Sequence, residues 1–331
     1  MDLDLETFLT ILYVQVDDWY RRVIVPQMPA HGGPPPKLSD SEVLCLGLAA
    51  QWRAGVPWKT ERGCLTYVRK QWHAMFPKLT SQSAFNRRLR RLWGGFILLQ
   101  QAVAQELIGP DEYEVMDAVP VPVAHGARSF HPGRLADIAR IGKGGNDRYF
   151  FGLHLLLISS ASGLATGWIL GAGNIQDRWL AEALLSARAG CPQLAGSGAA
   201  HLRPPTDWLG PVQASGRTSP RPLVEDAGFT GPRWHQHWQQ DYGTQVVTPP
   251  EGRVPRPVSR WFSGLRQVIE TVFSHLCDDF GLKYPGAHTT WGLLTRVAAK
   301  LAAYNLGLAR VRGRGGIIRD PWSDHVAAGG R

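Results

Sequence analysis

Residues 149–158 read Tyr-Phe-Phe-Gly-Leu-His-Leu-Leu-Leu-Ile, a run that is long and apolar enough for the central strand of a sheet. Residues 159–163, Ser-Ser-Ala-Ser-Gly, have the composition of a turn, and residues 164–170 return as a second strand. Upstream, residues 113–117, Tyr-Glu-Val-Met-Asp, form a shorter apolar strand. The three segments together predict an antiparallel meander.

Downstream of the meander, helices and strands are expected to alternate. The pattern predicts a helix at 177–188, a strand at 223–226, a helix at 232–240, a strand at 244–248 and a helix at 259–279. Residues 191–220 are rich in Gly, Pro, Ser and Ala and are interpreted as a surface insertion, because they are too long for a tight connection. Residues 119–123, Val-Pro-Val-Pro-Val, should leave regular sheet pairing because proline lacks an N–H donor. The expected fold class is α/β, with a mixed five-stranded sheet flanked by helices.

The first 108 residues show helical spacing throughout and predict an all-helical region. Ser39-Asp40-Ser41-Glu42 has the form of a capping box at a helix start. A fourth helix, at 81–107, has an apolar stripe and a crowd of arginines, Arg87, Arg88, Arg90 and Arg91. A DNA-recognition helix has this character, although an ordinary surface helix with solvated arginines has it too. The expected domains are a helical DNA-binding region at 1–108, a catalytic domain at 109–311 that ends in a helix at 290–310, and a basic flexible tail at 312–331.

The bulk properties suit a nucleic-acid partner. The chain has 331 residues, a formal net charge of +9 and a sequence pI near 9.6, which favours binding to a polyanion. Its four cysteines are far apart and form no C-x-x-C pair, which argues against a zinc ribbon or a disulfide framework. No apolar run is long enough to span a membrane, and the acidic start, Met1-Asp2-Leu3-Asp4, does not resemble a signal peptide. A cytoplasmic location is therefore expected.

Three acidic residues are the candidate catalytic and metal-binding groups. Asp117 ends the first strand, Asp226 follows the fourth, and Glu270 lies in the helix after the fifth. Two divalent cations about 3.5–4 Å apart can activate the attacking oxygen and stabilise the leaving oxygen of a phosphodiester. Mg²⁺ prefers carboxylate oxygens and keeps several waters, so two or three acids on rigid elements are sufficient.

Other readings of nearby residues remain open. Asp177 is the rival for the second acid, although its position before a helix suits a cap better. Glu225 should point to the opposite face of the strand from Asp226 and is interpreted as structural. Arg266 could contact a phosphate, orient Glu270 or form an ordinary i, i+4 surface pair with it. The two histidines of the helix at 232–240, His235 and His237, are expected to be solvated or packed and not to bind metal.

In order along the chain, three short motifs resemble those of the insertion-sequence DDE transposases, whose catalytic domain is RNase H-like. Met116-Asp117-Ala118 resembles the first-acid strand, and Glu225-Asp226-Ala227-Gly228-Phe229 resembles the D-x-G-F/Y second-acid motif. Arg266-x-x-x-Glu270 resembles the third-acid helix. The fuller third-acid signature has a Tyr and a Lys where this chain has Ser263 and Cys277. Lys283 or Arg296 is the expected substitute in holding the DNA end.

The resemblance implies that Asp117, Asp226 and Glu270 hold two Mg²⁺ ions, with Mn²⁺ able to substitute. It implies a transposase that binds the terminal inverted repeats of its own element, cleaves there and joins the freed end to target DNA. A homodimer on double-stranded DNA, in a prokaryotic nucleoid, is expected because two element ends must be brought together. Two alternatives remain: an RNase H-like nuclease or resolvase that cuts without strand transfer, and a catalytically inert DNA-binding protein derived from a transposase.

Overall fold

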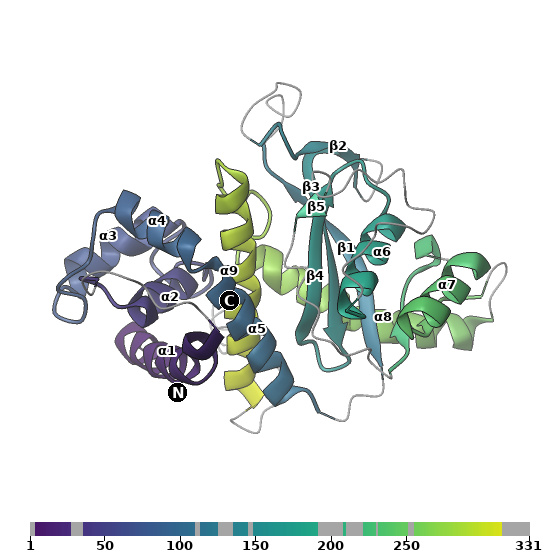
Figure 1. Cartoon of the computed structure of the whole chain (residues 1–331), viewed down its shortest axis with the longest axis horizontal. Coiled ribbons are helices and arrows are strands. Elements are labelled where there is room, and N and C mark those ends of the chain that lie inside the picture. The colour runs from purple at the N-terminus through teal and green to yellow at the C-terminus, as the bar shows by residue number, and fades with distance from the viewer. Residues whose placement is uncertain are drawn as a thin grey trace, which may run out of the picture. The chain divides into compact units, whose positions relative to one another are not determined.

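The computed structural model describes residues 4–27, 36–109, 113–124, 135–144, 148–190, 208–209, 221–229, 231–250 and 255–312 (Figure 1). These residues form two compact units. Unit 1 takes in the described residues of Met1–Leu107, His275–Leu282 and Trp291–Arg331, and unit 2 those of Ile108–Ser274 and Lys283–Thr290. The division after Leu107 lies next to the boundary expected at residue 108, and the C-terminal helix groups with the N-terminal residues. The expected tail beyond Arg312 lies outside the described residues.

The described part of unit 1 is helical. Its helices are α1 (Leu5–Trp19), α2 (Asp40–Ala49), α3 (Glu61–Gln71), α4 (Gln82–Arg91), α5 (Trp93–Leu107) and α9 (Thr290–Arg312) from Trp291 onward, with a π-helical turn (Tyr20–Ile24) and a 3-10 turn (Val25–Gln27) after α1. Side chains cap four of these helices at Asp4, Ser39, Thr60 and Ser81. The predicted capping box is confirmed: Glu42 N donates to Ser39 Oγ, and Ser39 N donates to a Glu42 carboxylate oxygen 2.6 Å away.

The single helix expected at 81–107 is wrong, because two helices occupy this segment. Helix α4 ends at Arg91, and Leu92 leaves helical geometry with φ −94° and ψ 10°. Trp93-Gly94-Gly95 follows at once, and paired glycines add flexibility that weakens a continuous helix. The apolar stripe runs through the break, since Leu92 and Phe96 are both buried, so the periodicity alone does not reveal it.

Unit 2 is built on a mixed sheet of seven strands in its described part (Figure 1). The strands are β1 (Glu114–Pro122), β2 (Arg140–Lys143), β3 (Tyr149–Ser160), β4 (Ala165–Ala172), β5 (Trp208–Leu209), β6 (Leu223–Val224) and β7 (Val246–Val247). The order is β5-β4-β3-β1-β6-β7, with β2 paired to β3. β1, β3 and β4 form the predicted antiparallel meander, whereas β6 runs parallel to β1 and β7 parallel to β6. The protein is therefore α/β, as expected.

Two strands exceed the five that the sequence predicts. β2 is a four-residue strand inside a stretch that reads as polar and basic, and it pairs antiparallel with β3. β5 consists of two residues within the expected insertion at 191–220, where it pairs with β4. The remainder of that insertion lies outside the described residues. Both strands pair with a long apolar neighbour, which supplies a partner that their own composition does not indicate.

The expectation that residues 119–123 leave the sheet is also wrong, because β1 pairs with β3 as far as Pro122. Val123 N donates to Phe151 O at 3.0 Å, so the alternate residues Val119 and Val121 also direct their N–H groups toward β3. Pro120 and Pro122 direct their nitrogens to the other side, where β6 pairs only with Glu114 and Val115. The two proline nitrogens, which lack a hydrogen to donate, therefore point to the side of β1 where no described strand lies beside Pro120 and Pro122.

Helices cover the sheet of unit 2. α6 (Asp177–Arg188) and α7 (Pro232–Tyr242) lie against one face, where Leu180, Leu184, Trp238 and Tyr242 share a buried cluster with sheet residues that include Met116, Leu156 and Leu223 (Figure 1). α8 (Arg256–Asp278) approaches Asp117, the strand neighbour of Met116. Since successive side chains of a strand point to opposite faces, α8 meets the face opposite to α6 and α7. Among the described helices, none has the length and apolar character needed to cross a membrane.

Candidate active site

The register of two parallel strands places Asp117 and Asp226 side by side. Val115 of β1 is paired with Val224 of β6, and each aspartate lies two residues further along its own chain segment. Because side chains two residues apart share a face, both carboxylates point to the face that α8 covers. Asp117 is largely buried and Asp226 is about one-third exposed.

The guanidinium of Arg266 joins the two aspartates. Arg266 Nη2 lies 3.1 Å from Asp117 Oδ2 and 3.9 Å from Asp226 Oδ2. The other oxygen of each carboxylate is held by backbone: Ala118 N donates to Asp117 Oδ1, and Gly228 N donates to Asp226 Oδ1, both at 2.7 Å. One oxygen of each aspartate is therefore fixed, and the two remaining oxygens converge on a single cationic nitrogen.

The electrostatics at Asp117 combine opposing effects. Burial raises the pKa of Asp117 above its ordinary value, and the negative charge of Asp226 adds to this rise. The hydrogen bond from Ala118 N and the charge of Arg266 act in the opposite direction. A carboxylate that burial disfavours in its charged form gains from any cation placed beside it.

The D-x-G-F motif has a local physical reason. Residues Ala227–Phe229 form a 3-10 turn that brings Gly228 N back to the Asp226 carboxylate. A Cβ at Gly228 would lie 2.8 Å from Asp226 Oδ1, too close for a side chain without a shift of the aspartate. Phe229 is buried in the cluster beneath the sheet and anchors the turn. The backbone N–H of Gly228 thus orients the Asp226 carboxylate, while the buried Phe229 side chain anchors the turn.

Glu270 occupies the next turn of the helix that carries Arg266. Residues four apart lie on one helix face, so Glu270 is a neighbour of Arg266 along α8. Its side chain is exposed, and no hydrogen bond or ion pair joins it to another residue in the described part. Within the described ranges, no group of three or more His, Cys, Asp or Glu side chains could hold a metal ion. The structure thus brings together Asp117, Asp226 and Arg266, and it leaves Glu270 one helical turn away.

The donor set at Asp117 and Asp226 fits a hard divalent cation. Carboxylate oxygens are the ligands that Mg²⁺ and Mn²⁺ accept, and Mg²⁺ commonly binds through one or two carboxylates while water fills its other positions. Asp117 Oδ2 and Asp226 Oδ2 already face one positive charge, that of Arg266 Nη2. These two oxygens are the atoms that would hold the metal.

Two acids that compete with this assignment lie elsewhere. Asp177 is the first residue of α6 and not its N-cap, which is Gln176, and its Oδ1 lies 3.0 Å from His154 Nδ1. Glu225 is fully buried, and strand alternation places it on the side of Leu223, away from Asp226. Neither of its carboxylate oxygens has a hydrogen-bond partner among the described residues. Burial, and then the charges of Asp226 and Asp117, raise the pKa of Glu225 well above its ordinary value.

The arginines expected to bind DNA on α4 have different surroundings. Arg87 and Arg91 are exposed, and Arg90 is half-buried. Arg88 Nη2 forms an ion pair with Asp40 Oδ1, and its Nη1 donates to Leu38 O. Arg88 therefore ties α4 to the start of α2, whereas the exposed pair remains available to an anionic partner.

Lys283 and Arg296, the expected substitutes for the Tyr and Lys of the third-acid signature, differ in exposure. Lys283 is exposed in unit 2. Arg296 belongs to α9 in unit 1, where its Nε lies 3.8 Å from Glu61 Oε2 and its side chain is mostly buried. Of the two, Lys283 has the more accessible charge.

Sequence reasoning missed a buried carboxylate that holds α6 to α7. Glu182 accepts hydrogen bonds from Trp238 Nε1 at 2.8 Å and from Tyr242 Oη at 2.5 Å. His237 Nε2 lies 3.0 Å from Glu182 Oε1, and His237 Nδ1 is paired with Asp241. The signal was an acid inside the apolar face of a helix, next to Leu180, Ala183 and Leu184. The interpretation of His237 as a packed residue agrees with this contact.

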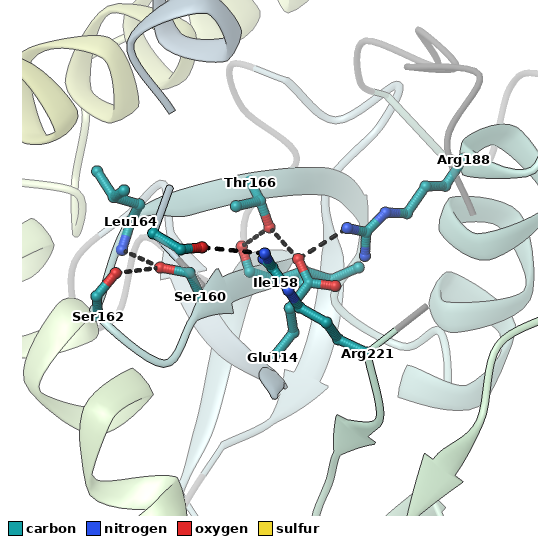
Figure 2. A network of polar contacts seen from close by, with 9 residues as sticks. Glu114, Ile158, Ser160, Ser162, Leu164, Thr166, Arg188 and Arg221 are labelled. Atoms are coloured by element: carbon teal, nitrogen blue, oxygen red, sulfur yellow. Dashed lines mark hydrogen bonds and ion pairs between the residues drawn. The ribbon is translucent and has the colours of Figure 1, made fainter. Parts of the chain in front are cut away.

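A second network of polar contacts that the sequence did not indicate surrounds Glu114, the first residue of β1 (Figure 2). The buried Glu114 side chain accepts at Oε1 from Arg188 Nη2 at 2.7 Å and from Thr166 Oγ1 at 3.1 Å. Arg221 Nη2 donates to the carbonyl of Gly109 at 3.0 Å. Arg188 ends α6 and Arg221 precedes β6, so the two arginines that flank the insertion are both bonded at this edge of unit 2.

Comparison of the chain with protein-family models, with curated proteins and with solved structures finds no match.

Proposed function

We propose that this protein is a DDE transposase whose catalytic domain is RNase H-like, and that Asp117, Asp226 and Glu270 are its metal-binding acids. The single observation that carries the proposal is the convergence of Asp117 Oδ2 and Asp226 Oδ2 on one cationic nitrogen. Two adjacent carboxylates repel each other, so their convergence requires a positive charge, which Arg266 supplies in the protein alone and a divalent cation would supply in a working active site.

The order of elements supports the RNase H-like assignment. An antiparallel meander that includes the first acid is followed by a helix, a parallel strand that leads into the second acid, a helix, a parallel strand and the helix with the third. The sheet brings the first two acids together, and α8 brings Arg266 to them, with Glu270 one turn further along the same helix. Asp117 lies on β1, Asp226 follows the end of β6 and Glu270 lies on α8, so regular elements support each acid.

The chain's own residues would divide the work at the site. Asp117 and Asp226 would bind the divalent metal, which supplies Lewis-acid activation of the attacking and leaving oxygens of the phosphodiester. Glu270, exposed one turn from Arg266, would complete the binding set when DNA and metal are present. The exposed Arg87, Arg91 and Lys283 would contact phosphates, where arginine can form two parallel hydrogen bonds. Strand transfer by direct attack of a 3′-hydroxyl requires no nucleophilic side chain.

The test begins with the DNA that flanks the gene. Inverted repeats that bracket the reading frame, with a short direct duplication outside them, would supply the substrate. The purified protein should then cleave at the repeat ends in Mg²⁺ or Mn²⁺ and join the freed 3′-end to a target plasmid. Cleavage without joining would favour a nuclease or resolvase. Binding without either reaction would favour an inert derivative of a transposase.

A further inference from the structure

The positive charge between the two aspartates belongs to the protein itself. Arg266 Nη2 faces Asp117 Oδ2 and Asp226 Oδ2, the two oxygens that backbone N–H groups leave available. These two oxygens are the ones most open to a divalent cation, because each Oδ1 already accepts a backbone hydrogen bond. The guanidinium and the metal therefore compete for one position.

The two cations cannot share this position. A divalent ion bound to both oxygens would lie within a few ångströms of the guanidinium, in a site where Asp117 is largely buried and like charges are poorly screened. A metal ion bound at these two oxygens would therefore displace the guanidinium of Arg266. The sign of the competition follows directly: whatever removes the guanidinium should strengthen metal binding in the DNA-free protein.

Arg266 is incompletely bonded where it lies. Its Nε is buried and has no hydrogen-bond partner among the described residues. A buried donor without a partner is unfavourable, so the present position of the guanidinium is less stable than its ion pairs alone suggest. A phosphate offers an arginine two parallel charge-assisted hydrogen bonds, which can satisfy Nε together with a terminal nitrogen.

We propose that Arg266 is a latch: it keeps the cation position between Asp117 and Asp226 closed in the DNA-free protein and releases it when a DNA phosphate draws the guanidinium away. This inference rests on the proposed metal-dependent function and adds its regulation. The latch couples the two ligands, because DNA that removes the arginine from the aspartates raises the affinity for metal. A transposase so built would hold its metal weakly until DNA is in place.

The test measures Mn²⁺ binding by calorimetry in the absence of DNA, with the wild type, Arg266→Gln, Arg266→Lys and the control Arg260→Gln. Arg266→Gln removes the charge and should bind Mn²⁺ roughly ten- to hundredfold more tightly, the factor that corresponds to one charge-assisted hydrogen bond. Arg266→Lys retains a competing charge and should stay close to the wild type. Arg260 lies on the exposed part of α8, so Arg260→Gln should leave the affinity unchanged.

A second measurement uses only the wild-type protein and does not depend on the folding of a variant. Phenylglyoxal modifies accessible arginines, and mass spectrometry reports the modification of each one. Saturating Mn²⁺ should increase modification of Arg266 and leave that of Arg260 unchanged. Equal modification of Arg266 with and without Mn²⁺ would overturn the latch.

The outcomes separate the latch from the function on which it rests. Suppose that the wild type binds Mn²⁺, that Asp226→Asn abolishes this binding and that Arg266→Gln does not raise the affinity. This result would overturn the latch but would leave the metal site supported. Failure of the wild type and of Arg266→Gln to bind Mn²⁺ at millimolar concentration would overturn the metal site itself. Tighter Mn²⁺ binding by Arg266→Gln, without a change in Arg266→Lys or Arg260→Gln, would support both the latch and the metal site.

Discussion

Replacing Glu182 by alanine should strongly destabilise unit 2. Glu182 is almost fully buried and accepts hydrogen bonds from Trp238 and Tyr242, while His237 contacts the same carboxylate. Trp238 is completely buried, so its indole N–H would lose its only hydrogen-bond partner in the described part of the chain. An unsatisfied buried donor costs ~1–3 kcal/mol, and loss of the charged partner of His237 adds ~1 kcal/mol. The expected loss in free energy of unfolding is about 3 kcal/mol.

The assay is urea denaturation, followed by circular dichroism at constant pH. Glu182→Gln is the matched control: it retains an acceptor of the same shape and should lose about 1 kcal/mol. A double-mutant cycle with Trp238→Phe isolates the indole contribution, because the Glu182→Ala change should cost at least ~1 kcal/mol less when the indole N–H is absent. A loss below about 0.5 kcal/mol for Glu182→Ala, which is the range of ordinary surface substitutions, would refute the reasoning.

Three further predictions concern other contacts. Burial acts to lower the pKa of His237, but the hydrogen bonds and charges of Glu182 and Asp241 outweigh it and raise that pKa. The contribution of His237 to the free energy of unfolding should therefore be complete below its unfolded pKa of about 6.5 and be lost as the pH rises through its folded pKa. In urea denaturation between pH 5 and 9, the free energy of unfolding should decline with pH, and His237→Gln should reduce this decline. Arg188→Met should cost about 3–5 kcal/mol in urea denaturation by leaving the buried Glu114 carboxylate without its counter-charge, and adding Glu114→Gln should restore most of the loss; an additive double mutant would contradict this. Gly264→Ala should raise the melting temperature through a gain of ~0.5–1 kcal/mol, because Gly264 lies inside α8 with no described atom within 4 Å of an added Cβ; a lower melting temperature would show a contact that the structure lacks.

Local signals predicted the elements that depend on local physics. The capping box at Ser39 and Glu42 is satisfied within four residues, so neither packing nor topology is needed to infer it. Helix α6 begins and ends where the apolar periodicity predicts, at Asp177 and Arg188. The meander was also predictable, because β3 is long and apolar and its turn is short.

Features that depend on a neighbour were missed or misread. Pro120 and Pro122 stay within β1 because β6 pairs with β1 only as far as Val115, so neither proline has to donate to a neighbouring strand. The sequence of residues 119–123 does not indicate where β6 ends. The break at Leu92 is hidden because both helices continue one apolar stripe. Glu182 is paired with residues 55 to 60 positions away, so spacing along the sequence does not show its partners.

The candidate site was predictable in part. The motifs select Asp117, Asp226, Arg266 and Glu270. The structure brings the first three together and leaves Glu270 exposed, one helical turn from Arg266. The contact of Arg266 with the aspartates was not expected, because the i, i+4 spacing suggested Glu270 as its partner. The side chain turns to two buried or half-buried carboxylates, whose need for a counter-charge exceeds that of an exposed glutamate.

The most direct test of the account is metal-dependent nicking of a supercoiled plasmid, which needs no knowledge of the element ends. The wild type should convert the plasmid to the open circular form in Mn²⁺ or Mg²⁺ and leave it intact in EDTA. Asp226→Asn should abolish nicking while retaining the circular dichroism of the wild type, whereas Asp177→Asn should cut normally. Nicking by Asp226→Asn at the wild-type rate would contradict the assignment of Asp117 and Asp226 as the metal-binding pair.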